Sequence, residues 1–229
     1  FMTLANLPPL VTVIGGSGFV GRYVVGALAK RGYRIRVVCR RPDLALFLQP
    51  LGNVGQISFV QANLRYPDSV KTAVEGSDHV INCVGLLAES GKNTFKSVQE
   101  QGAAVVAAAA KAIGAKLTHL SAIGADANSA SIYASTKGRA EKAVLDAIPD
   151  AIIIRPSVVF GPEDDFFNKF AAMAKTLPVL PLIGGGQTKF QPVHVGDVAE
   201  AVARAAVSPA AAGRTFELGG PAVMTFGRG

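Results

Sequence analysis

The stretch at residues 10–22 limits the possible fold of this chain most strongly, because a strand, a turn and a helix follow one another there. Its first five residues are apolar or β-branched, as in a short buried strand. Gly15, Gly18 and Gly21 follow at three-residue spacing, and a helical pattern runs over residues 19–30. Tight strand-to-helix turns also need glycine for packing alone. Here both flanks match a turn whose backbone amides and positive helix end attract a pyrophosphate, so the stretch predicts dinucleotide binding.

Alternating strands and helices predict a doubly wound parallel α/β sheet of the Rossmann type. The predicted strands are residues 10–14, 34–39, 57–61, 80–84, 116–120, 151–154 and 215–218, and the predicted helices are residues 19–30, 67–74, 93–113, 132–147, 166–175 and 195–207. After Pro156 the pattern loosens, because prolines and glycines interrupt it. We therefore expect a dinucleotide-binding domain at residues 1–155 and a small, incomplete lid region at residues 156–229, over the carboxyl edge of the sheet.

The composition is that of a folded chain with a large core. Of 229 residues, 49% are hydrophobic and 17% are charged. No apolar run reaches the ~18 residues of a membrane span, and no secretory leader is visible, so we expect no transmembrane segment and a cytoplasmic location. Cys39 and Cys83 end apolar runs, as core cysteines do. The three histidines lack the spacing of a metal site, and we expect no metal.

The net charge of +7 is concentrated around the second predicted strand, where five arginines lie between residues 31 and 41. Such an excess is compatible with a phosphorylated ligand, an anionic membrane surface or an acidic partner. No basic stripe alternates with aromatic residues, which argues against nucleic acid as a partner.

The end of the second predicted strand favours NADP(H) over NAD(H). Folds that prefer NAD usually carry an acid there for the ribose 2′-hydroxyl, whereas this chain has Arg40 and Arg41. A planar guanidinium pairs well with a 2′-phosphate, and Arg22 is placed to add a second contact. Two alternatives remain open: these arginines form a solvated face, or a shifted loop brings Asp43 to the ribose and NAD(H) binds instead.

Tyr133 and Lys137 stand four residues apart on one predicted helix, so they share a face. We expect the lysine charge to favour the phenolate and to bring the tyrosine closer to neutral pH as an acid and base. The same lysine is a candidate ligand of the nicotinamide ribose. The position after the fifth strand of a dinucleotide fold makes this pair a candidate catalytic site.

These motifs together resemble the short-chain dehydrogenase/reductase superfamily, in its extended or atypical branch. The segments that carry the resemblance are Gly15-x-x-Gly18-x-x-Gly21, Asn63-Leu64, residues 82–85, Tyr133-x-x-x-Lys137, and residues 155–162, 191–198 and 217–221. Residues 160–168 and 190–195 more narrowly resemble the subgroup that contains the NADPH-binding accessory subunit of respiratory complex I and its bacterial relatives. Membership of that subgroup implies complex I subunits as partners and a peripheral position on the inner face of the membrane.

The resemblance also implies a cofactor site and a set of catalytic residues. The implied cofactor contacts are Gly15, Ser17, Gly18, Phe19, Val20, Gly21, Arg40, Arg41, Asn63, Leu64, Val84, Gly85, Tyr133, Lys137, Pro156 and Val158. Asn63 stands where relatives more often carry Asp, but its amide oxygen is still able to accept a hydrogen bond from the adenine amine. The implied catalytic residues are Tyr133, Lys137 and Ser121, and Ser121 either polarises a carbonyl or caps the end of a strand.

The other conspicuous polar residues are predicted to be structural. We expect Ser131 and Asp197 to cap the helices that follow them. His79 and His119 lie in apolar strands and are predicted core residues. The acidic residues 163–165 are expected to form a solvated turn, with a lid contact or a docking surface as alternatives.

Two functions from different classes follow. The first is an NADPH-dependent reductase, or a redox-neutral epimerase or dehydratase, that moves hydride between a nicotinamide and a carbon bearing a hydroxyl or carbonyl. The second is a non-catalytic subunit of a respiratory assembly, in which bound NADPH stabilises the folded state by mass action.

Overall fold

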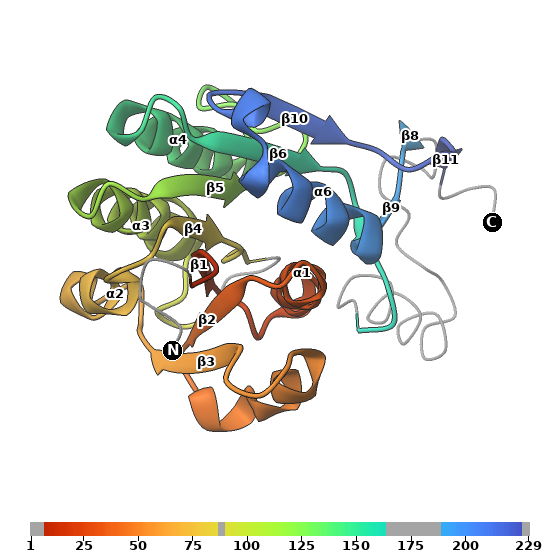
Figure 1. The fold of residues 1–229 in the computed structure, drawn as a ribbon. Coiled ribbons are helices and arrows are strands. Elements are labelled where there is room, and N and C mark those ends of the chain that lie inside the picture. The colour runs from red at the N-terminus through yellow and green to blue at the C-terminus, as the bar shows by residue number, and fades with distance from the viewer. Residues whose placement is uncertain (1–6, 87–89, 164–188, 226–229) are drawn as a thin grey trace.

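Seven strands form the central sheet, in the order β10-β6-β5-β4-β1-β2-β3 (Figure 1). The computed structural model describes residues 7–86, 90–163 and 189–225. The strands are β1 (Leu10–Ile14), β2 (Arg34–Cys39), β3 (Ile57–Gln61), β4 (His79–Asn82), β5 (Lys116–Leu120), β6 (Ile152–Pro156) and β10 (Thr215–Leu218). Every pair of neighbours in this sheet is parallel.

Helices cover both faces of the sheet, as Figure 1 shows. One face carries α1 (Phe19–Lys30) and α6 (Val195–Val207), and the other carries α2 (Pro67–Val74), α3 (Gln101–Ala112) and α4 (Ile132–Ala147). Val24 and Val202 belong to the core on the first face, and Val106 and Val144 to the core on the second. Because both faces are covered, the strands are apolar runs. The predicted doubly wound Rossmann fold is confirmed. None of the helices in the described ranges has both the length and the apolar character to cross a membrane.

The order of the sheet reverses at β1. All five residues of β1 are buried, and the strand pairs with β2 on one side and β4 on the other. The chain connections that leave β1 and β4 therefore diverge, and in a parallel sheet this divergence opens a crevice at the carboxyl ends of the strands. The glycine turn after β1 and residues 83–85 after β4 border that crevice.

The bounds of the predicted elements differ from the structure mainly at their ends. β4 ends at Asn82, two residues before its predicted end, and β6 extends to Pro156. The predicted helix at residues 93–113 begins with a π-helical turn, Phe95–Glu100, and continues as α3. Thr94 and Ser97 form a capping box at the start of that turn. Such turns carry one residue more per hydrogen-bonded ring than an α-helix, which apolar periodicity does not reveal.

Two elements after Pro156 belong to the layers of the main sheet. β10 is an edge strand beside β6, and α6 packs against α1 through the shared core. Short strands form two further pairs, namely β7 (Val159–Phe160) with β9 (Val193–His194) and β8 (Lys189–Phe190) with β11 (Met224–Thr225). The predicted helix at residues 166–175 lies outside the described residues. The division into residues 1–155 and a lid region stays a prediction.

The helix caps confirm one prediction and correct another. Ser131 caps α4, because its hydroxyl accepts a hydrogen bond from the Ala134 amide at 3.4 Å. For α6 the predicted cap, Asp197, is wrong. His194 is the N-cap, and its Nδ1 accepts a hydrogen bond from the Gly196 amide at 3.1 Å. Asp197 lies in the first turn instead, where a carboxylate interacts favourably with the helix dipole.

Candidate functional site

The glycine turn after β1 leaves no room for side chains. Gly15 adopts a φ of +76°, which L-residues rarely tolerate, and a Cβ on it would lie 2.9 Å from Val84 Cγ2. A Cβ on Gly21 would lie 2.2 Å from the Gly15 carbonyl oxygen, so α1 starts in direct contact with the turn. The Gly18 amide donates to the same carbonyl oxygen at 3.0 Å. The three glycines therefore form one tightly packed backbone cradle.

The N-terminus of α1 is free to accept an anion. Gly18 is the N-cap and supplies no side-chain hydrogen bond, and the first turn holds no acidic residue. The unsatisfied amides and the positive end of the helix dipole thus face the crevice without a competing carboxylate. A glycine cradle joined to such a helix end fits the pyrophosphate of a dinucleotide.

Arg22 supports this turn from the outside. Its guanidinium donates to the carbonyl oxygens of Ser17 at 3.1 Å and Gly18 at 3.2 Å, and it lies 4.9 Å from the centre of the Phe47 ring. Burial raises the pKa of the Cys39 thiol at the end of β2, and the Ser17 side chain acts in the opposite direction. Ser17 therefore lies close to the end of β2.

The two arginines predicted to bind a 2′-phosphate have different surroundings. Arg41 donates two hydrogen bonds to the Asp43 carboxylate, at 2.8 and 3.1 Å, and both side chains are exposed. Through this pairing the Asp43 carboxylate raises the pKa of Arg41, and the Arg41 guanidinium lowers the pKa of Asp43. The Arg40 guanidinium is exposed and has no hydrogen bond or ion pair with any described residue. Arg40 is therefore the better placed of the two to receive an anion.

The loop after β3 places Asn63 and Leu64 beside α3. The Asn63 Oδ1 accepts a hydrogen bond from the Arg65 amide at 3.0 Å, so one of its two lone pairs is used inside a local turn. Leu64 packs on Gly102, where a Cβ would come within 2.7 Å of Leu64 Cδ1. No described group bonds the second lone pair of Asn63 Oδ1, and the contact of Asn63 with adenine stays a prediction.

The segment after β4 connects the glycine turn with the predicted catalytic residues. The Val84 amide donates to Asn82 Oδ1 at 3.1 Å, and Val84 itself packs against the cradle. A Cβ on Gly85 would lie 3.4 Å from Lys137 Nζ. The structure thus brings Gly15, Val84, Gly85 and Lys137 together along one side of the crevice.

The remaining predicted cofactor contacts lie at the ends of β6 and α1. The Pro156 carbonyl accepts from the Ile123 amide at 3.0 Å, and the Val158 carbonyl accepts from the Val193 amide at 2.9 Å, so both positions are held by backbone bonds. No hydrogen bond or ion pair among the described residues joins Pro156 or Val158 to the other predicted site residues. Their cofactor role stays a prediction.

Phe19 and Val20, at the start of α1, take part in packing. Val20 contacts the core beneath the sheet, and a Cβ on Gly161 would lie 3.3 Å from the Phe19 ring. One turn later, the Tyr23 hydroxyl donates to Glu163 at 2.7 Å, and this bond raises the pKa of Tyr23. Glu163, the described member of the predicted solvated acidic turn, is exposed and holds the start of α1.

Tyr133 and Lys137 share a face of α4, as predicted, but the expected effect on the tyrosine is wrong. Burial raises the pKa of Tyr133, and no lowering by Lys137 offsets it. Lys137 is only 5% exposed, and burial lowers its pKa to about 8. Its Nζ lies 6.0 Å from the centre of the Tyr133 ring, and the centres of the Tyr133 and Phe95 rings lie 5.6 Å apart in a T-shaped arrangement. Burial thus brings the lysine, rather than the tyrosine, towards neutral pH.

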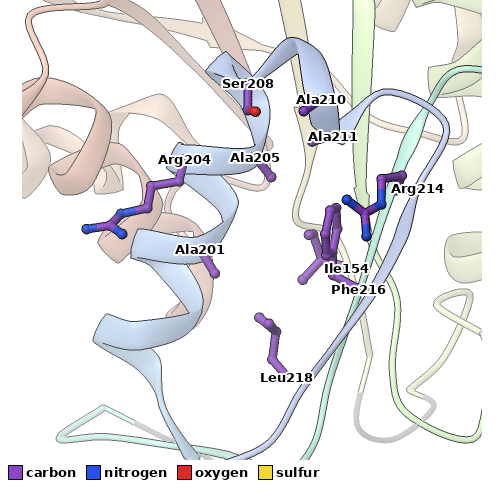
Figure 2. A pocket seen from close by; sticks show the side chains of 10 residues that line it. All are labelled: Ile154, Ala201, Arg204, Ala205, Ser208, Ala210, Ala211, Arg214, Phe216 and Leu218. Carbon is purple, nitrogen blue, oxygen red and sulfur yellow. The ribbon is translucent and has the colours of Figure 1, made fainter.

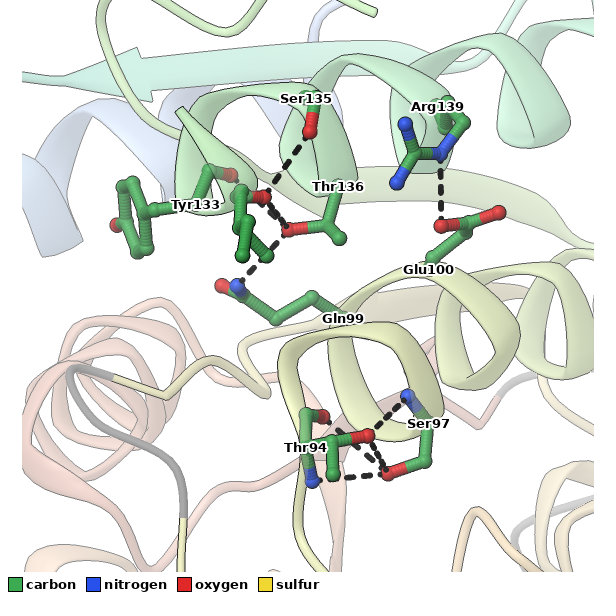
Figure 3. A network of polar contacts seen from close by, with 9 residues as sticks. Thr94, Ser97, Gln99, Glu100, Tyr133, Ser135, Thr136 and Arg139 are labelled. Atoms are coloured by element: carbon green, nitrogen blue, oxygen red, sulfur yellow. Dashed lines mark hydrogen bonds and ion pairs between the residues drawn. The ribbon is translucent and has the colours of Figure 1, made fainter. Parts of the chain in front are cut away.

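Three buried polar side-chain atoms have no hydrogen-bond partner in the described structure: Ser121 Oγ, His119 Nε2 and Gln99 Oε1. The Ser121 side chain therefore caps no strand there, and its hydroxyl is left for another group. Figure 3 shows Gln99 reaching from the π-helical turn towards Thr136 of α4, with a long contact of 3.5 Å. Unpaired buried polar atoms are costly, which is typical of a site that binds a ligand.

The hydrogen bonds of His119 define its tautomer. Because Asn82 Oδ1 accepts from the Val84 amide, Asn82 Nδ2 is the atom that donates to His119 Nδ1, at 3.2 Å. Burial lowers the pKa of His119 to about 3, so the neutral ring carries its proton on Nε2. His79 lies in the same pair of strands, bonds Thr118 at 2.8 Å and has its pKa lowered to about 4 by burial.

Sequence reasoning missed a charged network one turn further along α4. Glu141 follows Lys137 by one turn and is 6% exposed. Its carboxylate accepts two hydrogen bonds from Arg155 of β6, at 2.6 and 2.9 Å, and Arg155 also reaches Glu217 at 3.3 Å. The four-residue spacing of Lys137 and Glu141 was a visible signal, but the partner in β6 was not.

A groove of about 300 Å³ lies between α6 and β10, at the edge of the sheet (Figure 2). Ile154, Phe216, Leu218 and several alanines form most of its wall, and Arg214 lies over the Phe216 ring at 5.0 Å. None of the described residues predicted for the cofactor site lines this groove.

The sequence matches a family model and several known proteins. The model of the NAD dependent epimerase/dehydratase family matches residues 11–219. The mitochondrial NADH dehydrogenase (ubiquinone) 1 alpha subcomplex subunit 9 of Arabidopsis thaliana is 39% identical over 94% of this chain and 55% of its own length. A ceramide reductase of Caulobacter vibrioides is 33% identical over 83% of this chain and 58% of its own length. The chain thus spans little more than half of these relatives.

Solved structures show the same fold. An epimerase of Methanothermobacter thermautotrophicus superposes with a TM-score of 0.76 at 21% identity, over 97% of this chain and 75% of that one. The family match implies a nicotinamide dinucleotide as cofactor, and the uncapped glycine cradle is the structural feature that fits it. The chain belongs to the NAD-dependent epimerase/dehydratase family.

Proposed function

We propose that this chain binds NADP(H) and that Arg40 receives the 2′-phosphate. The observation that carries the proposal is the cradle formed by Gly15, Gly18 and Gly21 at the uncapped end of α1. Arg40 stands at the carboxyl end of β2, next to the crevice, with an exposed guanidinium that no described acid neutralises. A phosphate paired with such a group gains charge-assisted hydrogen bonds that a ribose hydroxyl does not.

Competitive calorimetry with NADPH and NADH tests this preference. Arg40→Gln is expected to weaken NADPH binding about tenfold or more and to leave NADH binding unchanged. Arg41→Gln is the matched control with a smaller expected effect, because Asp43 already neutralises Arg41. Asp43→Ala frees Arg41 and is expected to strengthen NADPH binding. Equal affinities of the wild-type protein for both nucleotides would overturn the preference.

For the chain as a whole, the proposed role is that of a cofactor-stabilised subunit of a complex I type assembly at the membrane surface. Its relatives include proteins named as subunits of NADH dehydrogenase. The structural support is an exposed apolar surface between β2 and β3, formed by Leu44, Leu46, Phe47, Leu51 and Val54, each at least 46% exposed. Apolar side chains gathered over so few residues are typical of an interface with another protein.

Fractionation of cells that produce the protein tests this role. Co-purification with membrane-bound NADH dehydrogenase is expected for the wild type and is expected to be lost in Leu46→Asp. Val223→Asp is the control, because Val223 is also exposed but lies outside this surface. A wild-type protein recovered only in the cytoplasmic fraction, or equal loss in both variants, would contradict the role.

The second candidate function is that of an enzyme, a reductase or an epimerase or dehydratase, that uses the same cofactor. The Ser121 hydroxyl, which has no hydrogen-bond partner among the described residues, and the buried Lys137 one turn after Tyr133 support it. In this role Ser121 polarises a carbonyl, Tyr133 exchanges a proton with the substrate oxygen and Lys137 binds the nicotinamide ribose. Tyr133→Phe is expected to abolish turnover of any substrate found while NADPH binding persists. Turnover that survives the substitution would exclude the proton-transfer role.

A further inference from the structure

Lys137 is buried where a cation is costly, and among the described residues Glu141 is the acid whose negative charge acts on it. Around it lie Tyr133 and Glu141 from α4, His119 from β5 and, through Glu141, Arg155 from β6. His119 is neutral and Tyr133 is a neutral phenol near pH 7. Among these groups only Glu141 stabilises the ammonium form of Lys137, and it opposes the larger effect of burial.

We propose that Glu141 is a positioning residue of the cofactor site, which keeps the Lys137 ammonium charged while Arg155 holds the Glu141 carboxylate in place. The proposal rests on the proposed NADP(H) binding, in which Lys137 contacts the nicotinamide ribose as a donor. Glu141 lies one helical turn from Lys137 on the same face, and both side chains are almost completely buried.

The position of the Glu141 carboxylate allows it to act on Lys137 only through its electric field, without a direct ion pair. Arg155 binds the carboxylate through two atoms, at 2.6 and 2.9 Å, so both oxygens are fixed and turned towards β6. No ion pair joins Glu141 to Lys137 among the described residues. In a buried environment, a carboxylate one turn away still lowers the cost of a charged lysine. Arg155 limits that benefit, because it is itself a cation close to the pair.

This arrangement predicts opposite effects of two neighbouring substitutions. Glu141→Gln removes the negative charge, leaves Arg155 positive and lowers the pH at which Lys137 loses its proton. Arg155→Gln leaves Glu141 unneutralised and raises that pH. A purely structural role of the pair would not produce shifts of opposite sign. Glu217→Gln is the matched control, because Glu217 contacts the exposed side of Arg155 and should leave Lys137 unchanged.

The titration is measured by NMR on protein with lysine labelled by ¹³C at Cε, and the Lys137 signal is assigned from its absence in Lys137→Gln. The wild-type midpoint is expected near pH 8. Glu141→Gln is expected to lower it by about one pH unit, and Arg155→Gln to raise it. If Glu141→Gln does not fold, the proposal is tested by the Lys137 midpoint in Arg155→Gln alone, which must then lie above that of the wild type. The proposal would be overturned if the Lys137 midpoints of Glu141→Gln and Arg155→Gln differed from that of the wild type by no more than the midpoint of Glu217→Gln does.

NADPH affinity measured against pH separates this inference from the proposed function. At pH 8 the wild type is expected to bind about twofold more weakly than at pH 6, and Glu141→Gln about tenfold more weakly, because deprotonated Lys137 donates no charged hydrogen bond. Absence of NADPH binding in the wild type at every pH would refute the proposed function, while the NMR titration would still decide the role of Glu141. NADPH affinity with the same pH profile in both proteins would refute the inference alone.

Discussion

The two ends of the crevice are built in different ways. At the β1 end, the site is backbone: Gly15 in a left-handed conformation, and Gly21 too close to it for a Cβ. At the β5 end, the site is side chains that burial has perturbed: Lys137 with a lowered pKa and Ser121 with an unpaired hydroxyl. The β1 end has no room for a Cβ at its glycines, so the addition of a single methyl group should disable it. The second end is costly to the unliganded fold, so removal of its polar groups should stabilise the protein.

The largest expected effect on NADPH binding is that of Gly21→Ala at the β1 end. The new Cβ would lie 2.2 Å from the Gly15 carbonyl oxygen, so the start of α1 must move away from the turn. We expect loss of measurable NADPH binding and about 2 kcal/mol lower stability, as for other overpacking substitutions.

Gly26→Ala is the matched control in the same helix. The nearest atom to its Cβ would be Leu51 Cδ1 at 3.8 Å, an ordinary contact. We expect unchanged NADPH binding and about 0.5 to 1 kcal/mol higher stability, because alanine is the better helix former. Fluorescence titration and urea unfolding measure both quantities. NADPH binding by Gly21→Ala with wild-type affinity would contradict the cradle.

The second expected effect is a loss of stability in acid, caused by the two buried histidines of β4 and β5, the strands at the other end of the crevice. The pKa values of His79 and His119 are lowered to about 4 and about 3, whereas the unfolded chain protonates histidine near pH 6.5. Stability is therefore full above pH 6.5 and falls as the pH drops towards 4, since only the unfolded chain takes up these protons. At pH 5 each histidine should cost about 2 kcal/mol.

Urea unfolding at pH 7 and pH 5 measures this loss. His119→Leu should reduce it by about half, because one of the two histidines is then absent. An equal free energy of unfolding at both pH values would show that both imidazoles become protonated inside the folded protein.

The third expected effect is a gain in stability from Lys137→Met. The pKa of Lys137 is about 8 in the folded protein against 10.5 for the free side chain, so burial of the charge costs about 3 kcal/mol below pH 8. Methionine avoids that cost, and the gain should disappear as the pH rises from 8 to 10.5. The same variant should bind NADPH more weakly. A variant less stable than the wild type at pH 7 would show that the ammonium is well compensated.

The smallest expected effects compare two buried hydroxyls. Thr118→Val removes the 2.8 Å bond to His79 and should cost about 1 to 2 kcal/mol, because it leaves a buried ring nitrogen unpaired. Ser121→Ala removes a hydroxyl that bonds no described group, so we expect an unchanged or slightly higher stability. Thermal unfolding of both variants measures the difference. A Ser121→Ala variant as unstable as Thr118→Val would show that Ser121 is paired in solution.

Features set by local backbone chemistry could be predicted from the sequence. The strand, glycine turn and helix at residues 10–30 required only apolar periodicity and glycine spacing, and α4 with its Ser131 cap followed the same rules. The helical turns at residues 42–51 were missed, because Pro42 and Pro50 suppress a helical reading. The end of β6 and the π-helical turn depend on hydrogen bonds that periodicity does not show.

Properties set by burial could not be predicted from the sequence. The spacing of Tyr133 and Lys137 placed them on one face, but the direction of the tyrosine pKa depends on how much of the ring the neighbouring segments cover. The pairing of Arg41 with Asp43, which leaves Arg40 as the one of these two arginines without an acid partner among the described residues, depends on the conformation of one exposed loop. The contact of Arg155 with Glu141 joins residues on separate elements, so it becomes visible only once α4 lies against β6.

The most direct test of the account is native mass spectrometry of the purified protein with NADPH and NADH at equal concentration. The cradle and the unpaired Arg40 predict one bound dinucleotide per chain, with the mass of NADPH, and loss of that adduct in Gly21→Ala but not in Gly26→Ala. A folded wild-type protein that carries neither nucleotide, or an adduct that persists in Gly21→Ala, would contradict the account.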